Sequence, residues 1–247
     1  MPEPRVLFFD TENAPNKGYT WGKWEQNVIE FVTPWYFLSF AYKWQGEKAI
    51  HCVSLPDFPN YKKDPINDRR LVHQLWRVLD EADVVIAHNG DRFDIRKANA
   101  RFAAHGFRPP SPYKTVDTLK IARRYFQFDS NKLDDLGQTL GVGRKLPHTG
   151  KHLWFGCMGG DKKSWEIMRR YNCQDVALLE RVYLKLRPFA VSHPNLNHIS
   201  RSECCPTCQS PAWEYRGFNY TKTGKRRRMH CLSCGAWSTT GNLIRVA

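Results

Sequence analysis

Apolar residues along the first three quarters of the chain fall into two kinds of run. Short β-branched or aromatic runs predict strands, and these are Val6–Phe9, Trp35–Trp44, Ile50–Leu55 and Val84–Ala87. Stretches with apolar residues at helical spacing predict helices at Leu71–Leu79, Arg92–His105, Thr118–Phe126, Leu133–Leu140 and Trp165–Leu186. Because strands and helices keep alternating, the pattern predicts an α/β fold.

Two stretches show neither the period of a strand nor that of a helix. Gly141–Lys163 is rich in Gly and Lys and is predicted to be a loop. Phe189–Glu203, which follows a helix-ending proline and is rich in Asn and His, is predicted to be a linker. We therefore expect a domain at 1–188, a linker at 189–203 and a small module at 204–247.

Composition narrows the class of protein. The 247 residues carry a formal net charge of +14, which favours a polyanionic partner such as nucleic acid, although a solvated basic surface is the alternative. No stretch approaches the roughly 18 apolar residues of a membrane span, and the first residues lead into a strand pattern, not a signal peptide. We expect a cytoplasmic protein, of bacterial or phage origin, with no membrane partner.

Three motifs place acidic residues near the ends of predicted elements. Asp10-Thr11-Glu12 follows the first strand, where alternation turns both carboxylates to one side, and such paired oxygen ligands suit Mg²⁺ or Mn²⁺. Asp94 falls in the first turn of a helix, where dipole compensation is the ordinary explanation. Tyr171 and Asp175 share a helical face, which is also common for a half-buried Tyr beside a solvated Asp.

Taken together, the motifs occur in the order DxE, NxxxFD and YxxxD, and the chain resembles the DEDD superfamily of 3′–5′ exonucleases in its tyrosine branch (DEDDy). Similar patterns occur in proofreading domains of family B DNA polymerases and in stand-alone phage and bacterial exonucleases. The resemblance covers about Val6–Leu186, including Asp117–Leu119 and Asn131–Leu136, while polymerase motifs are absent. It implies an RNase H-like fold, with a mixed central sheet flanked by helices.

The resemblance also implies a mechanism with two Mg²⁺ or Mn²⁺ ions. Asp10 would bridge the ions, Glu12 and Asp175 would hold the ion that activates water, and Asp94 would support the ion at the leaving 3′ oxygen. Four crowded carboxylates are strained without cations, which supports this ligand set. Tyr171 would orient the water, because a phenol with a pKa of about 10 is a poor base at neutral pH. The expected product is a 5′-mononucleotide.

Three polar residues near these motifs have simpler interpretations. Asn89 follows the strand Val84–Ala87 and resembles the Asn of the second motif, which contacts the terminal nucleotide or the catalytic loop; a turn-forming Asn before Gly is an equal alternative. Asp117 is interpreted as the N-cap of the following helix. Asp91 is interpreted as a loop or capping residue.

Four of the eight cysteines form two CxxC turns separated by 22 residues, namely Cys205, Cys208, Cys231 and Cys234. This spacing is typical of a structural zinc site, and the segments between the turns are expected to pair as a hairpin around Thr223-Gly224, as in a zinc ribbon. Four thiolates leave no open position, so one structural Zn²⁺ is expected. Cys204 and His230 are competing ligands, and a disulfide pair is the alternative in an oxidising compartment.

From residue 188 onward, eight Lys or Arg residues face two acidic ones. The basic tip suits phosphate contact, and its aromatic neighbours suit base stacking or a small core. The predicted contact residues are Lys222, Lys225, Arg226, Arg227 and Arg228.

The resemblance implies a 3′–5′ exonuclease, which we expect to act on single-stranded or frayed DNA 3′ ends, with the ribbon aiding binding. The preference for DNA rests on the resemblance to replication-associated enzymes, so an exoribonuclease is the first alternative. A non-catalytic nucleic-acid-binding adaptor and a structure-specific endonuclease are the others. Replication or repair proteins are possible partners that the sequence does not identify.

Overall fold

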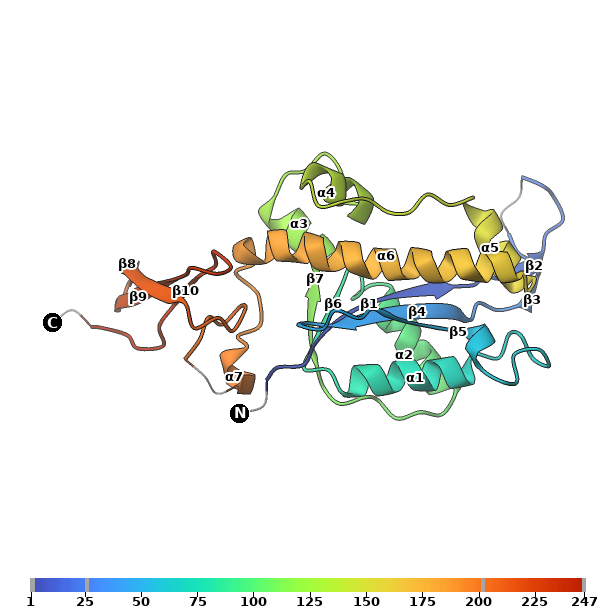
Figure 1. Cartoon of the computed structure of the whole chain (residues 1–247), viewed down its shortest axis with the longest axis horizontal. Helices are drawn as coiled ribbons and strands as arrows, with labels where there is room; N and C mark the ends of the chain where they lie inside the picture. Colours follow the sequence, from blue (N-terminus) through green and yellow to red (C-terminus); the bar gives the residue numbers. More distant parts are fainter. Residues whose placement is uncertain (1–2, 25–26, 201–202, 246–247) are drawn as a thin grey trace.

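The computed structural model describes residues 3–24, 27–200 and 203–245, and its centre is a mixed five-stranded sheet in the order β5-β4-β1-β6-β7 (Figure 1). Strand β1 pairs with β4 antiparallel and with β6 parallel. The strands of this sheet are β1 (Val6–Asn13), β4 (Phe37–Trp44), β5 (His51–Ser54), β6 (Val84–Ala87) and β7 (Lys114–Asp117). This is the predicted RNase H-like α/β architecture.

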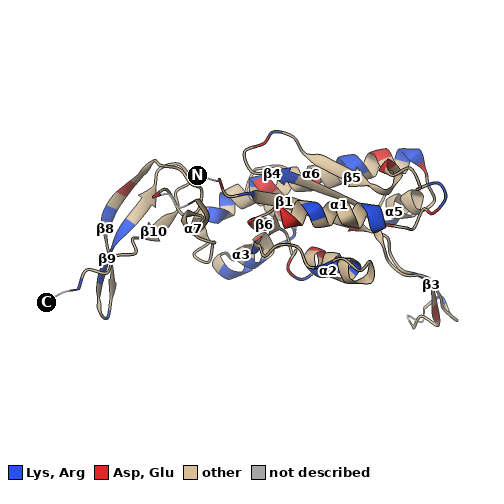
Figure 2. Ribbon diagram, turned by 90° about the horizontal axis from the view of Figure 1, so that it is seen from below, with Lys and Arg blue, Asp and Glu red and all other residues tan. Residues whose placement is uncertain are grey.

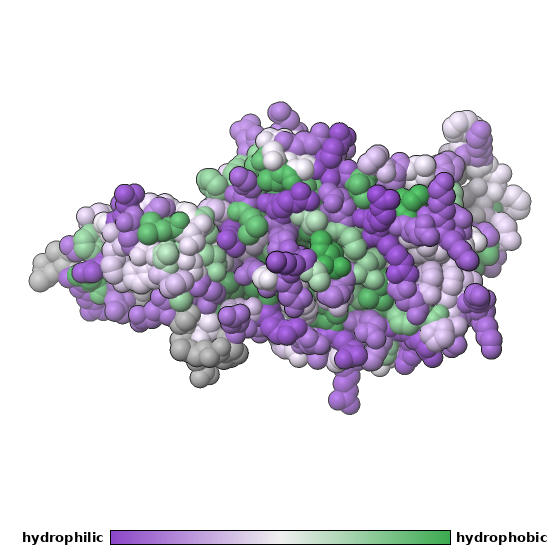
Figure 3. Space-filling view, viewed as in Figure 1, coloured by the Kyte–Doolittle hydropathy of each residue, from purple (hydrophilic) through white to green (hydrophobic). Residues whose placement is uncertain are grey.

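Helices cover both faces of the sheet. The long helix α6 lies on one face, and α1 and α2 lie on the other (Figure 1). The helices are α1 (Arg69–Asp80), α2 (Asp94–Ala104), α3 (Thr118–Tyr125), α4 (Leu133–Thr139), α5 (Lys151–Met158), α6 (Lys162–Leu186) and the short α7 (Asn197–Ser200), with single turns η1 (Leu55–Asp57) and η2 (Arg187–Phe189). On the face that Figure 3 shows, hydrophobic residues gather near the middle, between α6 and α1, and hydrophilic side chains surround them.

Strand β1 separates two hydrophobic clusters because its side chains alternate between the faces. Phe9 belongs to the cluster that contains Leu75 of α1 and Phe102 of α2. Phe8 belongs to the other cluster, and its ring lies 5.4 Å from that of Tyr183 on α6. By the same alternation, Asp10 and Glu12 face α6, whereas Thr11 faces α2.

The prediction of a loop over Gly141–Lys163 is wrong in part. Helix α5 occupies Lys151–Met158, and α6 begins at Lys162, three residues before the predicted start. Only Leu153 and Cys157 of α5 are buried, four residues apart. A helix of eight residues has too few buried positions to show a helical period in the sequence.

The predicted linker is ordered and packed for most of its length. It contains the end of η2 and the helix α7, and Ala190 and Leu196 are buried. The Tyr183 hydroxyl and His193 Nε2, 2.7 Å apart, connect α6 to this segment. Residues 201–202 of the predicted linker lie outside the described residues.

The C-terminal module is a three-stranded sheet in the order β10-β9-β8. Strands β8 (Trp213–Thr221) and β9 (Gly224–Cys231) form the predicted hairpin, and β10 (Trp237–Thr239) pairs with β9. Leu196 of the linker donates a backbone hydrogen bond to Pro206, 2.8 Å long. The domain boundaries remain predictions. No helix in the described part of the chain is long and apolar enough to span a membrane.

A second hairpin, β2 (Lys17–Tyr19) with β3 (Glu30–Thr33), interrupts the connection between β1 and β4. Its strands of three and four residues are too short for a periodic signal. Figure 2 shows this hairpin projecting from the body of the domain near the label β3.

Candidate metal centres

Three carboxylates meet at the end of β1. Asp10 and Glu12 extend from alternate positions of the strand, and Asp175 comes from α6, which packs on that face. One oxygen of each lies within 4.8 Å of the others. Asp175 Oδ1 is buried and has no hydrogen-bond partner among the described residues. A hard cation such as Mg²⁺ or Mn²⁺ fits this arrangement of oxygen ligands.

Asn172 fixes α6 against β1. Its side-chain amide donates a 2.8 Å hydrogen bond to Asp10 Oδ2, and its carbonyl oxygen accepts one of 3.1 Å from the Ser39 hydroxyl. Asn172 and Ser39 are fully buried. Asn172 was not among the predicted site residues, although it lies within the motif from Tyr171 to Asp175.

Glu12 has a partner from the helix that sequence analysis missed. The Trp154 indole on α5 donates a 3.0 Å hydrogen bond to Glu12 Oε2. The Trp154 and Tyr171 rings lie 6.0 Å apart, edge to face. Helix α5 therefore closes one side of the carboxylate group.

Asp94 lies apart from the other three carboxylates. It begins α2, as predicted, and α2 packs on the opposite face of the sheet. Asp94 Oδ1 accepts hydrogen bonds from the Thr11 hydroxyl (2.6 Å) and the Thr11 amide (3.2 Å). Its charge still raises the pKa of Asp10. The role of Asp94 as a metal ligand stays a prediction.

Lys145, from the loop between α4 and α5, inserts a positive charge beside the carboxylates. Its Nζ donates hydrogen bonds to Asp175 Oδ2 (2.6 Å) and to the Tyr171 hydroxyl (3.1 Å). Burial alone would lower the pKa of Lys145, but Asp175 and Tyr171 raise it above its ordinary value. Lys145 is therefore a cation that faces the candidate site.

Burial and crowding raise the pKa values of the four carboxyl groups and of the Tyr171 phenol. Burial, followed by the Asp175 charge, raises the pKa of Asp10 well above its usual range and that of Glu12 to about 8. Burial likewise raises the pKa of Asp94 to about 6 and that of Asp175. Burial and Asp175 also raise the pKa of Tyr171, so its phenol keeps its proton at neutral pH. Divalent cations would relieve this repulsion.

A cavity of about 570 Å³ lies next to Lys145, at the carboxyl end of β6. Its lining includes the polar side chains His88, Asn89, Arg123, Asn131 and Lys132. Asn89 has a φ of 64°, so it forms the turn that was one of its two predicted roles. Contact between Asn89 and a nucleotide stays a prediction. Asp117 caps α3 as predicted, by accepting a 3.0 Å hydrogen bond from the Leu119 amide.

The family model of the RNase H superfamily matches residues 40–187, more than half of the chain. The chain belongs to the RNase H superfamily. The match begins after Asp10 and Glu12, so their place beside Asp175 rests on the geometry of the structure.

Among solved structures, this RNase H superfamily chain is similar to the family B DNA polymerase from the hyperthermophilic archaeon Pyrobaculum calidifontis. The TM-score is 0.57 at 15% identity, and the similarity covers 90% of this chain and 32% of the polymerase. At this identity the likeness shows a shared fold, and the chain spans about a third of the polymerase. No curated protein matches the sequence.

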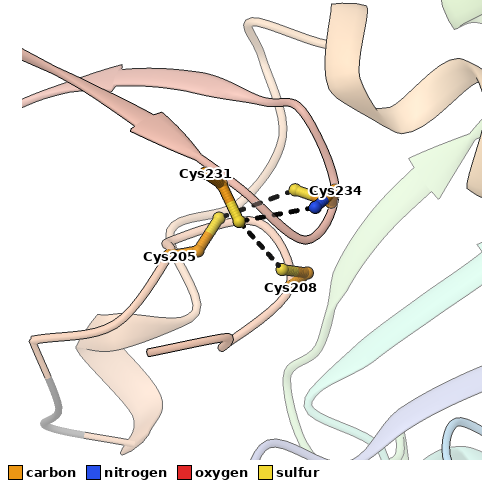
Figure 4. Close-up of side chains that lie close together, drawn as sticks. All are labelled: Cys205, Cys208, Cys231 and Cys234. Atoms are coloured by element: carbon orange, nitrogen blue, oxygen red, sulfur yellow. Dashed lines mark hydrogen bonds between the residues drawn. The ribbon is translucent and has the colours of Figure 1, made fainter. Parts of the chain in front are cut away.

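The four predicted zinc ligands converge in the C-terminal module (Figure 4). The Sγ atoms of Cys205 and Cys234 lie 3.7 Å apart, as do those of Cys208 and Cys231. A tetrahedron with Zn–S bonds of about 2.3 Å has S···S edges of about 3.8 Å, so this cluster fits Zn²⁺. Neither competing ligand joins the cluster; the His230 ring stacks on Trp237 at 4.6 Å.

Several of the predicted phosphate-contacting side chains lie against the module's own aromatic rings. Lys225 lies 4.6 Å from the Phe218 ring, and Arg227 lies 5.2 Å from the Tyr215 ring. Lys222, Arg227 and Arg228 are exposed. Figure 2 shows basic residues along β8 and β9. Their contact with nucleic acid stays a prediction.

Proposed function

We propose that this chain is a metal-dependent 3′–5′ exonuclease that hydrolyses single-stranded or frayed DNA 3′ ends to 5′-mononucleotides. The observation that carries the proposal is the meeting of Asp10, Glu12 and Asp175 within 4.8 Å. Membership of the RNase H superfamily supports a nucleic-acid substrate. The choice of DNA, and of the 3′ end, rests on the motif resemblance.

In this proposal, Asp10, Glu12 and Asp175 would hold two Mg²⁺ or Mn²⁺ ions, and Asp94 would support the second ion directly or through water. Such ions supply activation of the attacking water and stabilisation of the leaving 3′ oxygen. Asn172 keeps Asp10 turned toward α6. The Trp154 hydrogen bond orients Glu12 in the same way.

Tyr171 acts as a hydrogen-bonding group in this proposal. Its raised pKa keeps the phenol protonated at neutral pH, so it can orient the attacking water but cannot act as a base. Lys145 donates hydrogen bonds to the phenol oxygen and to Asp175. Lys145 thereby also sets the position of both groups.

The C-terminal module supplies affinity in this proposal. Its cysteine cluster holds one structural Zn²⁺, and its exposed basic side chains contact phosphates. The packed linker joins the module to the end of α6 through Tyr183 and His193. The module therefore has a fixed connection to the helix that carries Asp175.

The test is release of mononucleotides from labelled single-stranded DNA and RNA, with Mg²⁺, Mn²⁺ or EDTA. Wild type should release nucleotides from DNA only with a divalent ion. Asp10→Asn should lower the rate by about 10²–10³-fold, the equivalent of the several kcal/mol that metal ions contribute. Faster release from RNA than from DNA would show that RNA is the preferred substrate. Tight binding without release would favour the adaptor.

A further inference from the structure

The hairpin between β1 and β4 carries the two most exposed aromatic side chains in the described part of the chain, Trp21 and Trp24. We call its described residues, 17–24 and 27–33, the aromatic arm. The exposed fractions are 87% for Trp21, 84% for Trp24, 61% for Tyr19 and 53% for Phe31. Strands β2 and β3 form a separate two-stranded sheet. Large aromatic side chains held in solvent by an ordered hairpin indicate a binding surface.

The aromatic arm is rooted at the candidate metal site. The arm begins at Lys17, five residues after Glu12, and Glu12 lies on β1 together with Asp10. At its base, Ala14 donates a backbone hydrogen bond of 2.9 Å to Tyr36, and Asn16 Oδ1 accepts one of 2.7 Å from the Trp35 amide. These bonds fix where the arm leaves the domain.

An aromatic and cationic surface connects Asp94 with the base of the arm. Phe93, which precedes Asp94, is 44% exposed. Lys97 Nζ lies 4.9 Å from the Phe93 ring and 3.9 Å from the Trp35 ring. A strand leaving the carboxylate group in this direction would meet flat rings and a positive charge before it reaches the arm.

The chemistry of the arm fits nucleobases. Its two most exposed side chains are indoles, whose flat faces stack on any base. Lys23 Nζ lies 5.2 Å from the Trp24 ring, and Lys17 adds a second positive charge. Val28, Ile29 and Val32 are less exposed, at 42–49%. Indoles beside lysines combine base stacking with attraction to phosphate.

We infer that the aromatic arm is a single-stranded DNA-binding site, in which Trp21 and Trp24 stack on bases of the strand whose 3′ end lies at the carboxylates. This inference rests on the proposed function for the identity of the substrate. It adds a contact site at the opposite end of the molecule from the C-terminal module (Figure 1).

The test is the affinity for a fluorescein-labelled single-stranded oligonucleotide of about 12 nucleotides, measured by anisotropy in EDTA so that no cleavage occurs. The variants are the double substitutions W21A/W24A, W21L/W24L and W21F/W24F. Both tryptophans are exposed, so folding should persist, as circular dichroism would verify. We expect at least about tenfold weaker binding for the Ala and Leu pairs and a change within about threefold for the Phe pair.

An abasic oligonucleotide of the same length is the matched ligand. It should bind wild type and W21A/W24A equally, because it has no bases to stack. Equal affinity of wild type and W21A/W24A for the normal oligonucleotide would overturn the inference. Full affinity in W21L/W24L would also overturn it, because the arm would then act as an apolar surface without stacking.

Hydrolysis of p-nitrophenyl thymidine 5′-phosphate separates this inference from the proposed function. This ester has one base and cannot reach the arm from the carboxylates, so W21A/W24A should cleave it at the wild-type rate. Asp10→Asn should cleave it about 10²–10³-fold more slowly than wild type. A wild-type protein that leaves the ester and DNA uncut would contradict the nuclease proposal, while the binding comparison would still decide the arm.

Discussion

Lys145 Nζ lies 2.6 Å from Asp175 Oδ2, so a loop residue contributes a positive charge to a group of buried carboxylates. The same ammonium donates to the Tyr171 hydroxyl, 3.1 Å away. Lys145 therefore has two effects on the candidate site. It orients Tyr171 and Asp175, and its charge competes with any cation that approaches them.

Removing this charge should separate the two effects. In Lys145→Met, we expect kcat to fall about 10–100-fold because Tyr171 and Asp175 lose their common donor. The metal concentration for half-maximal activity should fall as well, because a repelling charge is gone. Steady-state kinetics over a Mn²⁺ titration would measure both. Lys120→Met, which breaks an exposed ion pair with Asp91, is the control and should change neither quantity. Weaker metal binding in Lys145→Met would contradict this account.

Asn172 should contribute to stability as well as to the site. Asn172→Leu leaves Asp10 and the buried Ser39 hydroxyl without a partner. The free energy of unfolding should fall by about 2–3 kcal/mol, the cost of unsatisfied buried polar groups. Urea unfolding would measure it, with Glu166→Ala on the exposed side of α6 as the control. A change below about 0.5 kcal/mol would show that these bonds do not hold α6 in place.

Without divalent ions, the protein should become less stable as the pH rises from about 5 to about 8. Burial and Asp175 raise the pKa of Glu12 to about 8 in the folded state, whereas the unfolded value is about 4.3. Between these values the folded state holds a proton that the unfolded state has released, so raising the pH favours unfolding. Thermal unfolding in EDTA across this range would show the decrease.

Glu12→Gln should reduce that pH dependence, because it removes one of the titrating groups. Added Mg²⁺ should raise the melting temperature of wild type more at pH 8 than at pH 5, since the ion binds the deprotonated carboxylates. A melting temperature that rises with pH in EDTA would contradict the prediction that burial raises the pKa values of the carboxyl groups at this site.

The C-terminal module should bind one zinc ion per chain. Cys208→Ser should abolish stoichiometric zinc by elemental analysis, whereas Cys204→Ser should retain it, because Cys204 lies outside the cluster. Removal of the zinc, followed by assay in added Mg²⁺, should lower affinity for DNA without stopping hydrolysis of the small thymidine ester. Loss of zinc in Cys204→Ser would show that the alternative ligand is used.

Sequence patterns predicted the parts of the site that depend on local geometry. Strand alternation placed Asp10 and Glu12 on one side, and an i, i+4 step placed Tyr171 beside Asp175. In the same way, the spacing of the two CxxC turns was enough to predict the four cysteines of the cluster. These features need only the period of a strand, a helix or a tight turn.

Sequence patterns could not predict contacts that depend on how distant segments pack. Lys145 comes from a loop without a period, and Trp154 comes from a helix of eight residues that was interpreted as loop. The position of Asp94 depends on which face α2 covers, a choice that its own sequence does not reveal. The β2–β3 hairpin could not be predicted, because its strands are too short to show alternation.

The proposed function requires that DNA be shortened one nucleotide at a time from the 3′ end. The most direct measurement follows the products from a 3′-labelled strand, a 5′-labelled strand and a circular single strand, in Mn²⁺, for wild type and Asp175→Asn. The account predicts immediate release of labelled mononucleotide from the 3′-labelled strand, a ladder from the 5′-labelled strand, an intact circle and loss of all cutting in Asp175→Asn. Cutting of the circle, release that starts at the 5′ end, or cutting that survives in Asp175→Asn would contradict it.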